Sequence, residues 1–153
     1  MKQQSTLKGL LILHRAMLLG QILFAAIAYF LKYTNNFPSS LVNEDQLLQG
    51  IAIAISFAGF FISSSLFKKR INEARDSTND IKEKAAAYRS ASIIQWALLE
   101  APSLFCIICF LLVGNYAFLA LSAALMLWFF LTGPSKTKAM LLLRLNEEEM
   151  EVF

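Results

Sequence analysis

The sequence predicts an all-α integral membrane protein. We expect a four-helix bundle with both termini in the cytoplasm and a cytoplasmic helical extension between helices 2 and 3. Three observations lead to this fold class. The 153-residue chain is 57% hydrophobic and only 16% charged, whereas soluble domains are typically about 45–50% apolar and about 25% charged. The charged residues gather in short blocks. The long stretches between these blocks approach the roughly 20 apolar residues that a helix needs to cross a bilayer.

Four segments have this character, and together they form one predicted transmembrane domain that covers the whole chain. They lie at about residues 10–31, 47–67, 91–113 and 116–132. The fourth is the shortest, so its limits are the least certain from pattern alone. The first follows a basic start and contains Ala26-Ile27-Ala28, which resembles a signal-peptide cleavage site. His14 and Arg15 interrupt its apolar run, which favours a retained span over a cleaved signal peptide.

The distribution of lysine and arginine predicts the orientation of the spans. Of the 14 basic residues, 13 lie at the N-terminus, between the second and third spans, or in the C-terminal tail, and only Lys32 lies elsewhere. Basic residues concentrate on the cytoplasmic side of membrane proteins. We therefore expect both termini, the loop at 68–90 and the tail at 133–153 in the cytoplasm, and the protein itself in the plasma (inner) membrane of a bacterium.

The cytoplasmic loop is predicted to be a helical hairpin. Residues 68–76 are good helix formers that can prolong the second span, and residues 77–80 read Ser-Thr-Asn-Asp, a break signal. Asp80 and Glu83 then have capping-box spacing for a new helix that runs into the third span. The alternative is a solvated loop with only nascent helix.

The tail begins with Gly133-Pro134-Ser135, which can stop one helix and start another. The mixed basic and apolar residues that follow are typical of an interfacial helix on an anionic leaflet, although they also fit the fraying end of the fourth span. We expect the final acidic stretch to be solvated.

The most informative polar residue is Glu100, within the apolar third span. It lies about nine residues into the span, or roughly 14 Å deep at about 1.5 Å per residue, near the centre of a core about 30 Å thick. A charge there costs at least about 2.5–3.5 kcal/mol, so a partner or a wet cavity is expected. Arg15 enters from the same side and is the candidate cation, and the other candidates for this polar site are His14, Gln95 and Gln21.

Pro102 lies two residues after Glu100 and leaves the carbonyl of Leu98 without its helical donor. Two interpretations of Glu100 stay open. It is either an intramembrane structural group, paired with Arg15 or protonated and hydrogen-bonded, or a site that binds a proton or another cation.

Other chemistry has little support in the residues. Cys106 and Cys109 lie within the third span and fit packing better than a redox motif. We predict no metal site and no cofactor, because no set of ligand side chains stands at suitable spacing. The chain has a single histidine and no nucleophile–base pattern, so an enzyme is not expected. No basic face interleaved with aromatics points to nucleic acid.

The second and third spans resemble the helical hairpin of the rotary ATPase proteolipid, or c subunit. Ala97-Leu98-Leu99-Glu100-Ala101 is similar to the helix that carries the proton-binding carboxylate in that family, and Arg89 precedes it as a basic residue does in some members. Small residues also recur at alternate positions of the second span, at Gly50, Ala52, Ala54, Ser56 and Ala58. The resemblance implies a proton-binding role for Glu100. Alanine and serine replace most of the family's glycines, its Arg-Gln-Pro loop core is missing, and two further spans flank the hairpin.

As a whole, the chain looks like a small four-span bacterial membrane protein. We expect a structural or interaction component whose partners are the lipid bilayer and either further copies of itself or another membrane protein. The alternative function is translocation of a proton or cation through Glu100.

Overall fold

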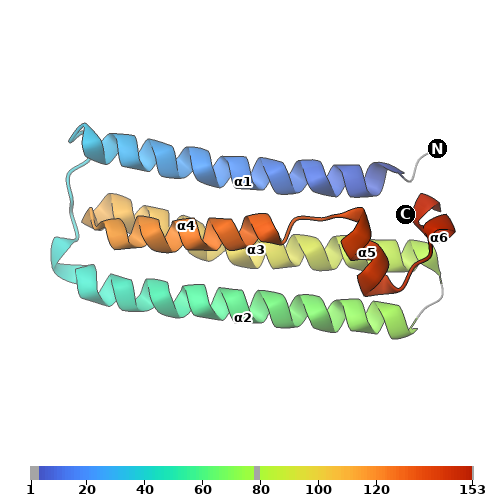
Figure 1. Cartoon of the computed structure of the whole chain (residues 1–153). Coiled ribbons are helices and arrows are strands. Elements are labelled where there is room, and N and C mark those ends of the chain that lie inside the picture. The colour runs from blue at the N-terminus through green and yellow to red at the C-terminus, as the bar shows by residue number, and fades with distance from the viewer. Residues whose placement is uncertain (1–3, 78–79, 153) are drawn as a thin grey trace.

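The computed structural model of the chain is helical and describes residues 4–77 and 80–152, without the side chains of residues 4–6, 77 and 150–152. Figure 1 shows the arrangement of the helices. No strand occurs among the described residues, so the predicted all-α class is confirmed. The elements are α1 (Gln4–Tyr33), the 3-10 helix η1 (Val42–Glu44), α2 (Asp45–Ser77), α3 (Ile81–Val113), α4 (Tyr116–Leu131), α5 (Lys136–Leu143) and α6 (Glu147–Val152).

The helix α3 is the centre of the molecule, because it packs against α1, α2 and α4. In Figure 1, α1 and α2 lie on opposite sides of the pair formed by α3 and α4. The helices α1 and α3 run in one direction, and α2 and α4 run in the other. The start of α1, the end of α2, the start of α3, and the helices α5 and α6 therefore lie at one end of the molecule.

Three helical segments are long and apolar enough to cross a membrane, at Leu7–Tyr33, Val42–Asp76 and Ile81–Val113. The pair α4 and α5 provides a fourth only if it counts as one span, and the two helices are bent by 73° at the break between them. The predicted fourth span is thus a single 16-residue helix, about 24 Å long at roughly 1.5 Å per residue. Length and composition agree with several membrane-crossing helices.

Large apolar side chains lie on the outside of the bundle, and several polar side chains are buried within its largely apolar core. Large apolar side chains are exposed along the outer faces of α1, α2 and α4, such as Ile12, Leu19, Phe57, Phe61 and Leu127, each at least 60% exposed. Polar side chains are buried between the helices: His14, Gln21, Ser56, Ser63, Ser92, Gln95, Ser103, Ser122 and Thr132. Hydrocarbon, rather than water, is the solvent that suits such an exterior.

The predicted helical hairpin between the second and third spans is confirmed. The helix α2 continues to Ser77, and α3 begins at Ile81. The Asp80 carboxylate accepts a hydrogen bond of 2.9 Å from the Lys82 amide, so it caps the N-terminus of α3 as its spacing predicted. Residues 78 and 79 of the predicted break lie outside the described residues.

The C-terminal segment forms two short helices. Ser135 caps α5 by accepting a hydrogen bond from the Lys138 amide, which confirms the predicted restart after Gly133-Pro134. The acidic tail forms α6, and Asn146, Glu147 and Glu148 are exposed there, in agreement with the solvation that we expect. Asn146 and Glu149 cap the start of this helix reciprocally at 2.7–2.8 Å. The helix α5 packs against α2, and α6 packs against α3.

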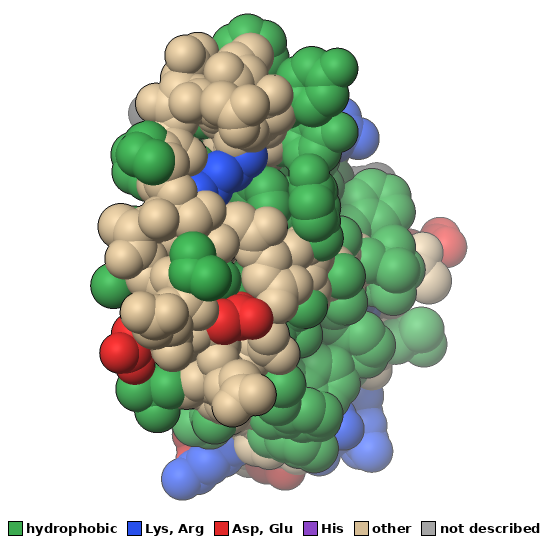
Figure 2. Space-filling model, turned by 90° about the vertical axis from the view of Figure 1, so that its left-hand side faces the viewer, with side chains coloured by type: hydrophobic (Ala, Val, Ile, Leu, Met, Phe, Trp, Pro, Cys, Tyr) green, Lys and Arg blue, Asp and Glu red, His purple; other side chains and the backbone are tan. Residues whose placement is uncertain are grey.

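The opposite end of the molecule carries few charges, as Figure 2 shows. Lys32 donates hydrogen bonds to the Phe37 carbonyl at 3.2 Å and to the Ser39 hydroxyl at 3.0 Å. Asn115 donates to the Asp45 carboxylate at 2.9 Å and 3.2 Å, and thereby ties the α3–α4 turn to the start of α2. Gly114 ends α3 in the left-handed conformation, at φ +86°.

The helices α2 and α3 approach closely through a stripe of small residues on α2: Ala52, Ser56, Gly59 and Ser63, all buried. A Cβ placed on Gly59 would lie 2.8 Å from the Leu98 carbonyl oxygen and 2.8 Å from Pro102 Cγ. The carbonyl that Pro102 leaves without a helical donor is therefore covered by Gly59. Such small-residue contacts let helix backbones approach in membranes.

The small residues that recur at alternate positions of the second span do not all face the same way. Gly50, Ala54 and Ala58 are exposed, and only Ala52 and Ser56 of that set are buried. Alternate residues of an α-helix point about 200° apart, whereas residues three or four apart share a face. The contact face therefore follows the spacing 52, 56, 59, 63.

Candidate intramembrane polar site

His14 lies where α1, α3 and α4 meet, and it is 4% exposed. Its ring stacks on Phe129 at 4.6 Å between ring centroids and tilts against Trp96 at 4.8 Å. Its Nε2 atom is 2.9 Å from the Phe129 carbonyl oxygen. A carbonyl only accepts hydrogen bonds, so Nε2 carries the proton in this contact.

The contacts of His14 satisfy the C-terminus of α4. The last carbonyls of a helix have no intrahelical donor and need another one. Phe129 O receives hydrogen bonds from His14 Nε2, from Thr132 Oγ1 at 2.6 Å and from the Thr132 amide at 3.0 Å. Trp96 Nε1 donates to the Thr132 carbonyl at 3.4 Å. His14 and Trp96 thus cap a helix that ends within the core, which is a structural role for both.

Gly133 makes room for this cap. A Cβ at Gly133 would lie 3.3 Å from His14 Cε1 and 3.3 Å from the Phe130 carbonyl oxygen. A side chain at this position would press on the imidazole. The glycine that the sequence suggested as a helix stop is therefore also a packing requirement of His14.

Deeper in the core lies a polar layer formed by Gln21, Ser103 and Ser122. The two serine hydroxyls are 3.0 Å apart, which joins α3 to α4. The helix α1 runs parallel to α3 and antiparallel to α4. His14, Trp96 and Phe129 lie together, so the residues seven positions deeper on each of these three helices also lie at about the same level. These residues are Gln21, Ser103 and Ser122.

Gln21 is the least satisfied polar group of this layer. Its side chain is 1% exposed, and neither its Nε2 nor its Oε1 atom has a hydrogen-bond partner. A buried amide without partners costs free energy because it has lost its contacts with water. The layer separates two apolar clusters of the core, one around Trp96 and Leu143 and the other around Phe110 and Phe118.

Glu100 lies apart from both groups, on the outer side of α3. It is partly exposed, and its neighbours Ala97 and Ala101 are exposed. Arg15 is also exposed. Among the described residues, the ion pairs are Lys69–Glu73 and Arg75–Asp76, and Glu100 and Arg15 form none. The structure does not join the expected pair within one chain.

The remaining candidates have smaller roles. Gln95 is 7% exposed and has no side-chain hydrogen bond among the described residues. Cys106 and Cys109 are free and buried, and Cys106 Sγ lies 3.8 Å from the Ser56 hydroxyl, as expected for packing residues. No group of three or more potential metal ligands occurs among the described residues.

The five predicted site residues therefore fall into three places. His14 caps α4, Gln21 and Gln95 are buried in the core, and Glu100 and Arg15 are unpaired on the outside. The Ser103–Ser122 contact and the role of Gly59 were not predicted from the sequence. The spacing of Ser56, Gly59 and Ser63 along one apolar helix is the signal that could have found the Gly59 contact.

In comparisons with family models, with curated proteins and with solved structures, nothing matches this chain. The resemblance to the proteolipid hairpin stays a prediction.

Proposed function

We propose that the protein is a non-enzymatic, multi-pass protein of the bacterial inner membrane that acts as an interaction component, and that it self-associates through the outer face of α3. Both termini lie in the cytoplasm in this proposal, as the lysine and arginine distribution predicts. The observation that carries it is the unpaired Glu100 carboxylate in the middle of an apolar helix.

A carboxylate at this depth needs a partner. Charged groups within a bilayer pair with one another or face a wet cavity, and no cation of the chain's described residues pairs with Glu100. Ala97, one turn before it, and Ala101, the residue after it, are exposed and small. Small residues allow another helix to approach closely, so this face suits a helix from a second chain.

Arg15 supplies the complementary charge on that second chain. Since His14 lies against Trp96, Arg15 is level with Ala97, three residues or about 4.5 Å from the level of Glu100. Both groups are exposed enough to reach another copy, and the long arginine side chain spans this offset. Pairing between copies would neutralise both charges at once.

A charge swap tests this assembly. Glu100→Arg should leave two facing cations and weaken self-association by about thirtyfold, which corresponds to about 2 kcal/mol. Glu100→Arg combined with Arg15→Glu should restore it. The measurement is the subunit count of purified protein in lipid nanodiscs by single-molecule photobleaching. A monomeric wild type, or a double variant no better than Glu100→Arg, would refute the proposal.

The second candidate function is proton or cation translocation at Glu100. The same lack of a partner favours it, because an unpaired carboxylate is free to take up a proton, and the proteolipid resemblance implies that role. Glu100→Gln would abolish such transport in proteoliposomes, and Glu100→Asp would retain part of it. The charge swap separates the two functions, because it restores an ion pair between copies but removes the acid from α3.

A further inference from the structure

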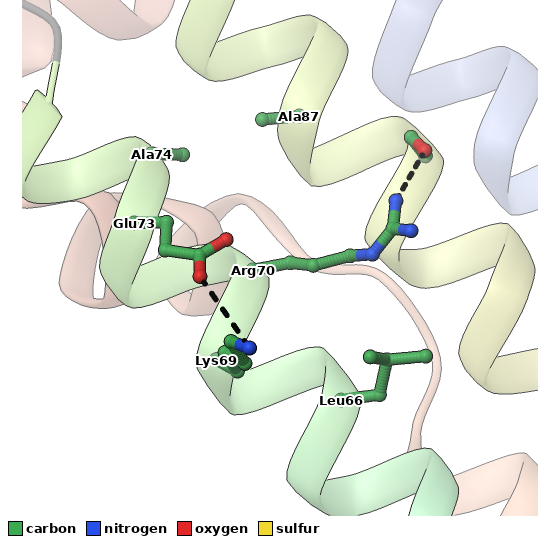
Figure 3. A pocket seen from close by; sticks show the side chains of 7 residues that line it. Leu66, Lys69, Arg70, Glu73, Ala74 and Ala87 are labelled. Atoms are coloured by element: carbon green, nitrogen blue, oxygen red, sulfur yellow. Dashed lines mark hydrogen bonds and ion pairs between the residues drawn. The ribbon is translucent and has the colours of Figure 1, made fainter.

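We infer that the groove between α2 and α3, at the end of the molecule that holds the chain termini, binds the phosphate headgroup of an anionic phospholipid. Figure 3 shows its polar part. This open pocket has a volume of about 450 Å³ and is lined by Leu66, Lys69, Arg70, Glu73, Ala74, Ala87 and Ser90.

The donors of the pocket come from both helices. Arg70 extends from α2 toward α3 and donates a hydrogen bond of 3.3 Å to the Ser90 hydroxyl (Figure 3). Lys69 forms an exposed ion pair with Glu73 at 4.0 Å, with side chains 73% and 62% exposed. Such a pair is weak, so Lys69 is free to turn to a phosphate. Ala74 and Ala87 have short side chains that leave the space open.

An apolar groove continues from this pocket along the outside of α2. It has a volume of about 320 Å³ and is lined by Phe61, Ile62, Ser65, Leu66 and Lys69. Leu66 and Lys69 line both parts. The site is therefore polar at one end and apolar at the other, which matches a headgroup followed by an acyl chain.

The position along α2 fits the same ligand. The apolar stretch ends at Phe67, and Lys68, Lys69 and Arg70 follow at once. In a span that ends there, these charges lie at the depth of the lipid phosphates, where basic pockets between helices bind anionic headgroups. The charges that line the pocket are two cations and one anion, so a monoanionic phosphodiester complements their sum.

Lipid titration of the full-length protein in detergent, followed by native mass spectrometry, tests the site. Phosphatidylglycerol should bind more tightly than phosphatidylcholine with the same acyl chains. Lys69→Gln and Arg70→Gln should each weaken phosphatidylglycerol binding by about fivefold and leave phosphatidylcholine binding unchanged. Glu73→Gln should strengthen phosphatidylglycerol binding, because it removes the one anion from the pocket.

Lys68→Gln is the matched control, because Lys68 is exposed and lines none of the pockets described along α2. If Lys68→Gln weakened phosphatidylglycerol binding as much as Lys69→Gln does, the lipid would be attracted to the basic surface in general, and the proposed site would be overturned. Displacement of phosphatidylglycerol by inorganic phosphate would overturn it in favour of a soluble anion. Loss of self-association, rather than of lipid binding, in Lys69→Gln would make the groove a protein interface and also overturn it.

Discussion

The contact between Gly59 and α3 gives a sharp prediction about stability. In Gly59→Ala the new Cβ would lie 2.8 Å from the Leu98 carbonyl oxygen and 2.8 Å from Pro102 Cγ. An ordinary contact needs about 3.4 Å or more, and neither the backbone carbonyl nor the proline ring can swing away. The helices must separate by several tenths of an ångström along their whole contact, and overpacking of this kind costs about 1–3 kcal/mol.

Gly50→Ala on the same helix is the matched control. A Cβ at Gly50 meets nothing within 4 Å, so this change only adds helix propensity, worth up to about 1 kcal/mol. The same propensity gain acts at Gly59, where the overpacking opposes it. We therefore expect Gly59→Ala to be less stable than Gly50→Ala by about 1–3 kcal/mol.

The assay is reversible unfolding in mixed micelles with increasing sodium dodecyl sulfate, followed by circular dichroism. The midpoint should fall for Gly59→Ala and should stay or rise for Gly50→Ala. Equal midpoints for the two variants would show that α2 and α3 do not touch at Gly59, and the close-approach reasoning would then be refuted.

Three further predictions concern the polar groups of the core. His14→Phe keeps the stacking on Phe129 but removes the donor to the Phe129 carbonyl, so the free energy of unfolding in the same assay should fall by about 1 kcal/mol. His14→Gln should lose less stability, because glutamine can still donate a hydrogen bond. Gln21→Leu removes two orphan groups at similar volume, so it should be neutral or stabilising, and a loss above about 1 kcal/mol would mean that the amide has a partner. Gly133→Val should destabilise the protein as His14→Phe does, because the new side chain displaces the imidazole. In a double-mutant cycle, the variant with both changes should lose less stability than the sum of the two single losses.

The helices could be predicted from sequence because their signals are local. Uncharged stretches, the Asp80 cap and the Gly133-Pro134-Ser135 break each depend on neighbouring residues, and each appears in the structure. The helix in the acidic tail was not predicted, because the reciprocal cap between Asn146 and Glu149 was not recognised. The close contact at Gly59 was not predicted, because it depends on which face of α2 meets α3.

The polar groups were harder to assign because their partners are far away in sequence. His14 bonds to a carbonyl 115 residues away, and that carbonyl is open to an outside donor because α4 ends there. Burial of Gln21 follows from which face of α1 meets α3, which composition does not reveal. Arg15 was the candidate partner of Glu100 because both spans enter from the same side, but only rotation about the helix axes decides whether two side chains meet.

The most direct test of self-association through Glu100 is a crosslink between two different copies of the chain. One copy carries Arg15→Cys and the other Glu100→Cys, with Cys106 and Cys109 replaced by alanine in both, and mild oxidation in native membranes traps neighbours. We expect a mixed disulfide dimer between the two chains, and a much weaker one when Arg15→Cys is paired with Ile53→Cys, an exposed control position on α2. No mixed dimer above that control would contradict the proposed interface.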